Sequence, residues 1–445
     1  MKRKIYNKLK TWKERSNGKS AALIDGARRI GKSYIAKEFA QNEYKSFILI
    51  DFSYPNPDVI KCFEEDYYDL NTFFQKLEYI FNTHLYKRES LIIFDEVQAY
   101  PKARQLIKHL VADGRYDYLE TGSLISLHQN VKDILIPSEE QHFKMYPMDF
   151  EEFLLALNHD LAIPFLKECF ENKKPLGSAV HMKMLREFRK YLLVGGMPQA
   201  VLEYSQSENF ENVDMIKKQI LSLYNEDIGK YSGKYKQKVS LILKNIPNEL
   251  AKKEKKFKLS NLGENARYRD YIDAFSWLEE SMIVNLCLNS TEPTIGFRLS
   301  ANITSQKCYM GDTGLLITHA FKDNEYLDNT LYKSILLDKL NINEGMLMEN
   351  IVAQMLKANG HELFFYSRYD KVSKENNMEI DFLISKNGKV SPIEVKSSSY
   401  NKHSSLDKFC KKFSKNIGEK YILYTKDVMI KDGITHLPIY MCMFL

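Results

Sequence analysis

The residues with the clearest chemical purpose form the octapeptide GARRIGKS at positions 26–33, which fits the phosphate-loop pattern G-x-x-x-x-G-K-[ST]. Gly26 and Gly31 allow the backbone to curl so that consecutive N–H groups point at one phosphate. Lys32 would reach the β- and γ-phosphates of a nucleotide, and the Ser33 hydroxyl would hold Mg²⁺. We predict that a nucleoside triphosphate binds here, in contact with the whole loop: Gly26, Ala27, Arg28, Arg29, Ile30, Gly31, Lys32 and Ser33.

The segments on both sides of the octapeptide are those that such a loop needs. The apolar run at 21–24 predicts a buried strand that enters the loop, and residues 34–40 predict the helix that leaves it. That helix would point the positive end of its dipole at the phosphate. The alternative is a glycine-rich turn before an ordinary helix, which the strand–loop–helix order disfavours.

A second apolar run of strand length, at 90–94, ends in Asp95 and Glu96. Two carboxylates at the carboxyl end of a buried parallel strand lie at the rim of the sheet, where such folds bind ligands. We expect Asp95 to coordinate Mg²⁺ through water, and Glu96 to orient and polarise the attacking water. The alternative is an acidic exit from a strand, which is common on any protein surface.

A third strand is predicted at 116–120, and it runs into Thr121-Gly122-Ser123. Small polar groups at this place would lie beside Asp95 and could sense the γ-phosphate. The same three residues are also typical of a plain turn.

Composition describes an ordinary soluble globular protein. Of 445 residues, 44% are hydrophobic and 27% charged, which on the usual domain size predicts about three domains. No apolar run approaches the ~18 residues of a membrane-spanning helix. The basic N-terminus lacks an apolar segment after it, and Ile5, Leu9 and Trp12 instead predict one face of an amphipathic helix. The six cysteines are scattered without a C-x-x-C pair, so we expect a reducing, cytoplasmic location and no zinc or disulfide framework.

The pattern of strands and helices divides the chain into four regions. Residues 1–146 alternate strands and helices, as expected of a nucleotide-binding α/β sheet. Residues 147–236 are helical and predict a lid or connector, broken by a turn at Gly195-Gly196-Met197-Pro198. Residues 237–328 form a third region, and residues 329–445 are α/β again.

The third region has the element order of a winged helix-turn-helix. Residues 257–262 precede a long helix predicted at 265–280, and the chain then enters a strand pair. Arg267 and Arg269 could face phosphates or base edges of DNA. The basic tract 252–256 could assist, and the alternative is a solvated lysine face on a packing module. The net charge of +6 permits an acidic partner without requiring one.

The last region carries a second acidic group. Asp381 lies on one predicted strand, and Glu394 and Lys396 lie two apart on the next, so these two face the same side. Two carboxylates and a lysine at a sheet rim can form a metal-dependent nuclease centre, in which the acids hold Mg²⁺ and the lysine positions water. Glu349, on an upstream helix, could add a ligand. The alternative is a β-hairpin with an exposed salt bridge between Glu394 and Lys396.

Taken together, the motifs resemble those of a known family. They occur in the family's order: IDGARRIGKS, LIIFDEVQAYP, ETGS, YPMDFEEF, YLLVGGMP, YMGDTGLL, GMLMEN, EIDFLI and PIEVKSSS. The chain resembles, over essentially its whole length, the bacterial and archaeal AAA-type ATPases with a C-terminal domain of unknown function. In that family the last third looks restriction-endonuclease-like, of the PD-(D/E)xK type.

The resemblance implies a P-loop NTPase fold, ATP and Mg²⁺ as ligands, Lys32 and Ser33 as Walker-A residues, and Asp95 and Glu96 as the Walker-B pair. The chain is also similar to the MNS/STAND-like branch of P-loop ATPases. In that branch a Gly-x-Pro turn touches the adenine, and Gly196-Met197-Pro198 matches that turn. The alternative for Pro198 is an interhelical turn. We identify no arginine finger after Ser123, so the sequence predicts no particular oligomer.

Two functions from different classes follow. In the first, the nucleotide state of the ATPase controls a C-terminal nuclease-like module directed at DNA, with Asp381, Glu394 and Lys396 as catalytic residues. In the second, the protein is a non-nucleolytic ATP-driven switch whose C-terminal domain is a docking or regulatory module.

Overall fold

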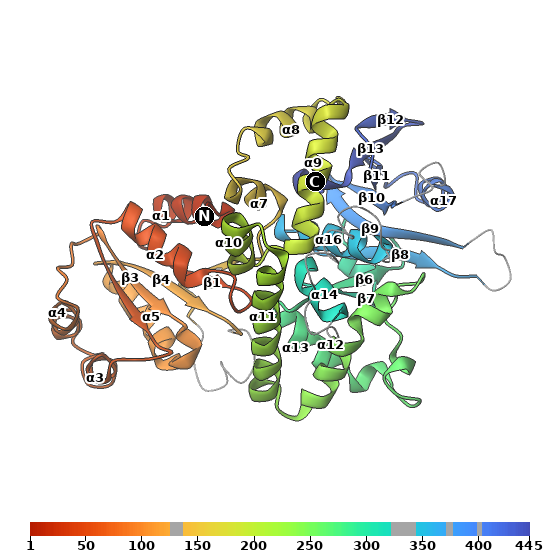
Figure 1. Ribbon diagram of the computed structural model, residues 1–445. Helices are drawn as coiled ribbons and strands as arrows, with labels where there is room; N and C mark the ends of the chain where they lie inside the picture. Colours follow the sequence, from red (N-terminus) through yellow and green to blue (C-terminus); the bar gives the residue numbers. More distant parts are fainter. Residues whose placement is uncertain (125–136, 322–343, 371–376, 398–402) are drawn as a thin grey trace. The chain divides into compact units, whose positions relative to one another are not determined.

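The computed structural model describes residues 1–124, 137–321, 344–370, 377–397 and 403–445 (Figure 1). Their contacts divide them into two compact units, Met1–Tyr146 with Glu280–Met282, and Pro147–Glu279 with Ile283–Leu445. Among the helices of these described ranges, none is both long and apolar enough to cross a membrane.

The first unit is built on a five-stranded, fully parallel sheet with the order β2-β3-β4-β1-β5. Its strands are β1 Ala21–Asp25, β2 Ser46–Asp51, β3 Ser90–Asp95, β4 Asp117–Gly122 and β5 Glu140–Lys144. The strands predicted at 21–24, 90–94 and 116–120 are confirmed. Because β4 separates β1 from β3, the carboxyl ends of these three strands lie side by side at one rim.

Helices of the first unit follow the strands, as the α/β pattern predicts. They are α1 Lys4–Ser16, α2 Lys32–Glu43, α3 Pro57–Glu65, α4 Leu70–Phe81 and α5 Pro101–Asp113. Ile5, Leu9 and Trp12 are the buried residues of α1, which confirms its predicted apolar face. A buried cluster that includes Ile92, Phe94 and Leu110 packs the sheet against its helices and fixes β3.

The second unit begins with helices and ends in a mixed sheet. The helices are α7 Phe150–Ala156, α8 Ala162–Glu171, α9 Ser178–Val194, α10 Pro198–Ser207, α11 Phe210–Tyr231, α12 Lys236–Ala251, α13 Ile272–Glu280, α14 Thr313–Ala320, α16 Glu344–Ala358 and α17 Ser404–Lys412. The helical region predicted after residue 147 is therefore present, and its turn lies between α9 and α10.

The sheet of the second unit has the order β12-β13-β11-β10-β9-β8-β6-β7. Its strands are β6 Val284–Ser290, β7 Ala301–Met310, β8 Phe364–Arg368, β9 Met378–Lys386, β10 Lys389–Val395, β11 Tyr421–Tyr424, β12 Met429–Lys431 and β13 Ile434–Pro438. The hairpin β9–β10 turns at Asn387 and Gly388, both with positive φ, as expected of an Asn-Gly turn.

The predicted winged-helix region differs from the structure in two respects. The helix predicted at 265–280 begins at Ile272, because Tyr268–Asp270 forms a tighter 3₁₀ turn. Tyr268 still stacks on Phe275, so the apolar face is retained without a continuous helix. In addition, β6 pairs in parallel with β8, so the strand pair β6–β7 belongs to the C-terminal sheet. The boundary predicted at 328/329 lies outside the described residues.

Candidate functional site: the nucleotide loop and the C-terminal acidic group

The octapeptide forms the turn between β1 and α2. Gly31 precedes α2 with φ 89°, and Arg29 adopts a left-handed φ of 68°. A Cβ on Gly26 would lie 2.4 Å from the carbonyl oxygen of Met145, so the position tolerates only glycine without a backbone shift. Ala27 and Ile30 are buried, whereas the neighbouring Arg28 and Arg29 are exposed.

Lys32 is buried inside the loop. Its Nζ donates hydrogen bonds to the carbonyl oxygens of Gly26 at 3.1 Å and Ala27 at 3.0 Å. Burial lowers the pKa of Lys32, and the carboxylates of Glu96, Asp25 and Asp95 oppose that shift. The ammonium group is thus held where the loop curls, within the field of three acids. A phosphate chain would offer it better acceptors than two backbone carbonyls.

Ser33 and Asp95 meet at the rim of the sheet. Burial raises the pKa of Asp95, and hydrogen bonds from Thr121 and Ser33 lower it. Thr121, at the end of β4, donates from Oγ1 to Asp95 Oδ1 and accepts the backbone N–H of Glu96 at 3.2 Å. The start of α2 and the ends of β3 and β4 therefore place a serine hydroxyl, a carboxylate and a threonine hydroxyl together, which is a hard oxygen donor set suited to Mg²⁺.

Glu96 follows β3 in a left-handed conformation with φ 52°. Its Oε2 accepts hydrogen bonds from Gln98 Nε2 and from Ser123 Oγ, the latter at 3.3 Å. The carboxylate is also among the charges that act on Lys32. Lys32, Ser33, Asp95 and Glu96, all predicted from the sequence, thus surround one location at the sheet rim.

Pro198 lies in the second unit, where it is the first residue of α10. The glycines before it are held by the turn that precedes α14. Gly196 N–H donates to Asp312 Oδ2 at 2.5 Å, and Met148 N–H donates to the Gly196 carbonyl at 2.7 Å. The predicted adenine contact of Pro198 stays a prediction.

The C-terminal acids are grouped around a lysine that sequence analysis did not select. Lys307 of β7 is fully buried, and its Nζ lies 2.9 Å from Glu379, 3.5 Å from Asp381 and 3.4 Å from Glu349. Glu349 also accepts from Lys255, and from the Tyr309 hydroxyl at 3.0 Å. Asp381 and Glu349 are therefore brought together, with an ammonium group between them.

Asp381 and Glu394 have different partners. Asp381 Oδ2 accepts the backbone N–H of Val395 at 2.9 Å. Burial raises the pKa of Asp381 to about 7, with Glu349 raising it further and Lys307 opposing. Glu394 instead pairs with Lys396, and its other charged neighbours, His403 and Asp407, belong to the start of α17. The predicted salt bridge of the alternative interpretation is present, although Glu394 is buried rather than exposed.

The predicted metal set at Glu349, Asp381 and Glu394 is not assembled. In the part of the chain that the structure describes, no three His, Cys, Asp or Glu side chains are placed to hold a metal ion. A divalent cation beside Asp381 would have to compete with the Lys307 ammonium, which already satisfies the same carboxylates. These residues do not fit a metal in this arrangement, and nuclease activity stays a prediction.

Gln98, Lys307 and Glu379 were not selected from the sequence. Lys307 had a usable signal, because a charged residue directly before the apolar run Cys308-Tyr309-Met310 needs buried partners. Lys255 was noted only as part of a basic tract. Lys252 pairs with Glu249, Lys255 with Glu349 and Lys256 with Glu254. Much of the positive charge of the tract is therefore neutralised by neighbouring carboxylates.

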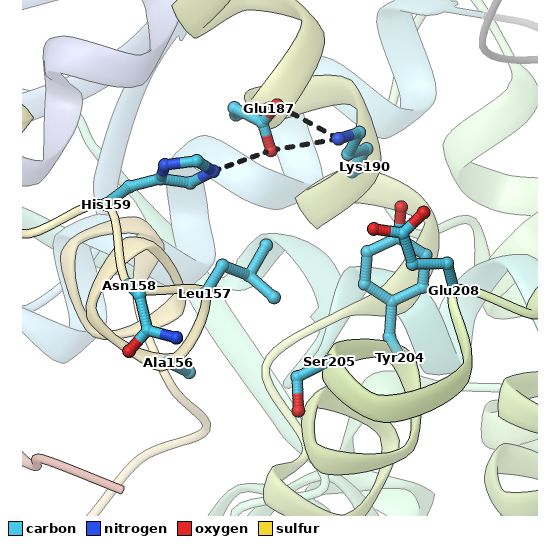
Figure 2. Close-up of a pocket in the computed structure, with 9 residues that line it drawn as sticks. All are labelled: Ala156, Leu157, Asn158, His159, Glu187, Lys190, Tyr204, Ser205 and Glu208. Atoms are coloured by element: carbon cyan, nitrogen blue, oxygen red, sulfur yellow. Dashed lines mark hydrogen bonds and ion pairs between the residues drawn. The ribbon is translucent and has the colours of Figure 1, made fainter.

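A separate hollow of about 300 Å³ lies in the second unit between the ends of α7 and α10 and the side of α9 (Figure 2). Glu187 accepts from Lys190 at 3.0 and 3.2 Å, and His159 Nε2 lies 3.7 Å from the same carboxylate. Tyr204 and Glu208 line another side of the hollow (Figure 2). Glu187 thus has both cationic side chains of the lining beside it, and no residue predicted for function lines the hollow.

Models of three protein families match the chain. The model described as an AAA domain matches residues 18–154, a domain of unknown function (DUF8612) matches 185–326, and another (DUF4143) matches 344–442. Residues 18–154 are therefore an AAA-type domain with a P-loop, and ATP is its expected ligand. The DUF8612 match extends across the boundary predicted at 236/237.

Among solved structures, the chain is similar to the Thermotoga maritima RuvB Holliday junction branch migration motor and to a point variant of Thermotoga maritima RuvB. Each is 10% identical with a TM-score of 0.29. The matches cover 64% and 63% of this chain, and 89% and 87% of those chains. No conclusion about this chain follows from a TM-score of that size. No curated protein matches the chain.

Proposed function

We propose that this protein binds Mg·ATP at the loop after β1 and hydrolyses it, and that its C-terminal part is a docking or regulatory module controlled by the nucleotide. The observation that carries the first statement is the junction of Ser33, Asp95 and Thr121 beside the buried Lys32. An oxygen donor set and a lysine at the mouth of a phosphate loop are the parts that phosphoryl transfer requires.

Each residue has a distinct role in the proposed reaction. Lys32 would leave its backbone partners and neutralise charge on the β- and γ-phosphates. Ser33 and Asp95 would hold Mg²⁺, which when bound offsets the negative charge of the phosphates. Glu96 would take a proton from the attacking water while the water oxygen bonds to the γ-phosphorus. The bond from that phosphorus to the bridging oxygen breaks, and ADP and phosphate leave.

The C-terminal proposal is supported by Lys307. A buried lysine paired with Glu379, Asp381 and Glu349 gives a stable internal charge cluster, which a nuclease centre would have to dismantle before it could bind a metal. The competing function is a metal-dependent nuclease at Asp381, Glu394 and Lys396. The docking role is favoured because the acids already have cationic partners.

The ATPase assignment is tested by phosphate release from purified protein with Mg²⁺. Lys32→Ala should lose nucleotide binding, and Glu96→Gln should bind ATP but turn it over at least about 10²-fold more slowly. Lys37→Ala, on an exposed position of the same helix, is the matched control and should behave as wild type. Equal turnover in all four proteins, or none in wild type, would contradict the assignment.

The docking role is tested by plasmid nicking with Mg²⁺ or Mn²⁺, with and without ATP. We expect no cleavage by wild-type protein that hydrolyses ATP normally. Cleavage that disappears in Asp381→Ala, while ATP hydrolysis persists, would replace the docking role by the nuclease.

A further inference from the structure

We propose that Gln98 is a positioning residue for ATP hydrolysis, whose Nε2 fixes the Glu96 carboxylate and whose Oε1 accepts a hydrogen from the attacking water. This inference rests on the proposed ATPase function and adds a residue to it.

The backbone holds Gln98 in a fixed place beside Glu96. Gln98 lies in the tight 3₁₀ segment Val97–Ala99 and Glu96 directly precedes it, and the Ala99 N–H donates to the Glu96 carbonyl at 2.9 Å. Val97, between them, is fully buried in the core cluster that packs β3. Because the buried Val97 anchors this segment, its backbone is held in place, and the side chains of Glu96 and Gln98 are held at the sheet rim.

The two donors of this site converge on one oxygen of Glu96. Gln98 Nε2 donates to Glu96 Oε2 and lies 3.5 Å from Ser123 Oγ, which itself donates to Oε2 at 3.3 Å. Since both hydrogen bonds go to Oε2, the orientation of the carboxylate is set, and its other oxygen is the one suited to take a proton.

The chemistry of the amide determines which way Gln98 faces. A carboxylate only accepts hydrogen bonds, so the NH₂ group of Gln98 must point at Glu96 and its carbonyl must point away. That carbonyl oxygen, Oε1, is buried and has no hydrogen-bond partner among the described residues. A buried acceptor without a partner is unfavourable, and such costs are retained where substrate supplies the partner.

A water molecule has the hydrogen-bonding groups that Gln98 Oε1 and Glu96 need, because it carries two donor hydrogens and a lone pair. It can donate one hydrogen to Glu96 and the other to Gln98 Oε1, which turns its lone pair toward the γ-phosphorus. Glu96 would then act as the base, and Gln98 would fix both the base and the nucleophile. The geometry needs a neutral amide at this position, because only an amide offers a donor and an acceptor on the two branches of one planar group.

The experiment compares steady-state ATP hydrolysis of wild type, Gln98→Glu and Gln98→Ala. Gln98→Glu keeps the shape but replaces the donor by a second carboxylate against Glu96. We expect kcat to fall by about 10²–10³-fold in both variants, as for loss of one pre-organised donor. The KM for ATP should stay within about threefold, because Gln98 does not contact the phosphate loop. Gln75→Glu, an exposed glutamine on α4, controls for the added charge and should match wild type.

The outcomes separate this inference from the proposed function. A wild type that neither binds nor hydrolyses ATP would remove the proposed function itself. An active wild type with unchanged kcat in Gln98→Ala, or with a loss confined to KM, would overturn the role of Gln98 alone. If Gln98→Glu does not fold, as judged by its melting temperature, Gln98→Ala and Ser123→Ala decide: Ser123→Ala removes the second donor to Glu96 and should lower kcat by a smaller factor.

Discussion

At the scale of single residues, Thr121 connects Asp95 and Glu96, the two acidic residues of the proposed ATP site. Its hydroxyl donates to Asp95 and accepts from the backbone N–H of Glu96 at 3.2 Å. Only a side chain that both donates and accepts can make this pair of bonds. Thr121 therefore orients Asp95 toward Ser33 from the neighbouring strand. Residues that hydrogen-bond to metal ligands commonly fix the orientation of those ligands in this way.

We expect Thr121→Val to weaken the use of Mg²⁺ more than the binding of nucleotide. Removal of an orienting hydrogen bond typically costs about 10–100-fold in metal affinity or activity. The Mg²⁺ concentration for half-maximal ATP hydrolysis should rise by a factor in that range. Thr121→Ser keeps the hydroxyl and should stay near wild type. An unchanged Mg²⁺ dependence in Thr121→Val would contradict the role.

The buried Lys307 leads to a prediction about the stability of the second unit. Lys307→Met removes the cation shared by Glu379, Asp381 and Glu349, which leaves Asp381 without its ammonium partner, while Glu349 keeps Lys255. Breaking a buried pair on one side costs about 3–5 kcal/mol, so the free energy of unfolding of the second unit should fall by that amount. Lys411→Met, at an exposed position on α17, is the control and should change little.

A compensating variant makes this test specific. Lys307→Met with Asp381→Asn removes a carboxylate together with the cation, so it should recover part of the loss seen in Lys307→Met. Denaturant unfolding of both proteins measures the difference. Purely additive effects of the two substitutions would argue against direct coupling.

At the scale of elements, two turns of the second unit are locked together. A Cβ on Gly196 would lie 2.1 Å from the carbonyl oxygen of Met148, and one on Gly314 would lie 2.5 Å from that of Val194. Asp312, between these turns, accepts from the N–H groups of Gly196 and Leu315. The motifs YLLVGGMP and YMGDTGLL are thus explained as one buried packing contact.

Gly196→Ala should therefore be strongly destabilising. The clash is with backbone atoms, which cannot rotate away, so the turn itself must shift. Overpacking of this kind costs about 1–3 kcal/mol or more. Gly263→Ala is the matched control, because a Cβ there meets nothing within 4 Å. Melting temperatures of the two variants measure the difference, and equal values would contradict the packing argument.

Because of Lys217 on α11, we expect the free energy of unfolding to increase with pH. Lys217 is fully buried, donates to the Leu193 carbonyl at 2.8 Å, and has its pKa lowered to about 8 by burial, against the opposing charges of Asp214 and Asp312. Above pH 8 the folded protein has released this proton, whereas the unfolded chain still holds it up to about pH 10.5. The unfolded state binds more protons in this window, so stability increases with pH.

The measurement compares wild type with Lys217→Met, which does not titrate. Between about pH 7.5 and 9.5, the free energy of unfolding of wild type should rise by about 2 kcal/mol relative to the variant, at ~1.4 kcal/mol per pH unit. A constant difference between the two proteins would show that Lys217 does not titrate in this range.

The sequence predicted that Lys32, Ser33 and Asp95 lie together at one rim of the sheet, because their positions follow from local order; their roles toward ATP stay predictions. A strand, a glycine loop and a helix place Lys32 and Ser33, and the end of the next buried strand places Asp95, whatever the rest of the fold does. The C-terminal group could not be derived in this way. Lys307 reaches Asp381 only because β6 and β7 join the sheet beyond β8, a long-range pairing that periodicity does not indicate. Glu394 likewise has partners near α17 that strand spacing does not reveal.

At the scale of the whole molecule, the stretch of chain at 145–148 runs from the proposed ATP site in the first unit to the locked turns in the second unit. Within the first unit, Met145 donates its N–H to the Asp25 carbonyl at 2.8 Å and packs on Gly26. Three residues later, within the second unit, Met148 pairs with Gly196 and accepts from the Tyr191 hydroxyl at 2.7 Å. Residues 145–148 are therefore a covalent link whose first residue is hydrogen-bonded beside the phosphate loop and whose last residue is hydrogen-bonded to the turn before α10.

Because of this connection, we expect nucleotide binding to change the amide exchange at the start of α10. ATP should slow amide exchange over residues 145–148 and at the start of α10, because both ends of the linking stretch are held by backbone hydrogen bonds. For amides that open only when the site opens, saturation at about 100 times Kd stabilises by ~2.7 kcal/mol, which sets a ceiling of roughly 100-fold slower exchange. Lys32→Ala should lose the effect, and Lys37→Ala should keep it. Slowing that appears around the phosphate loop but is absent from α10 would mean that the nucleotide signal ends in the first unit.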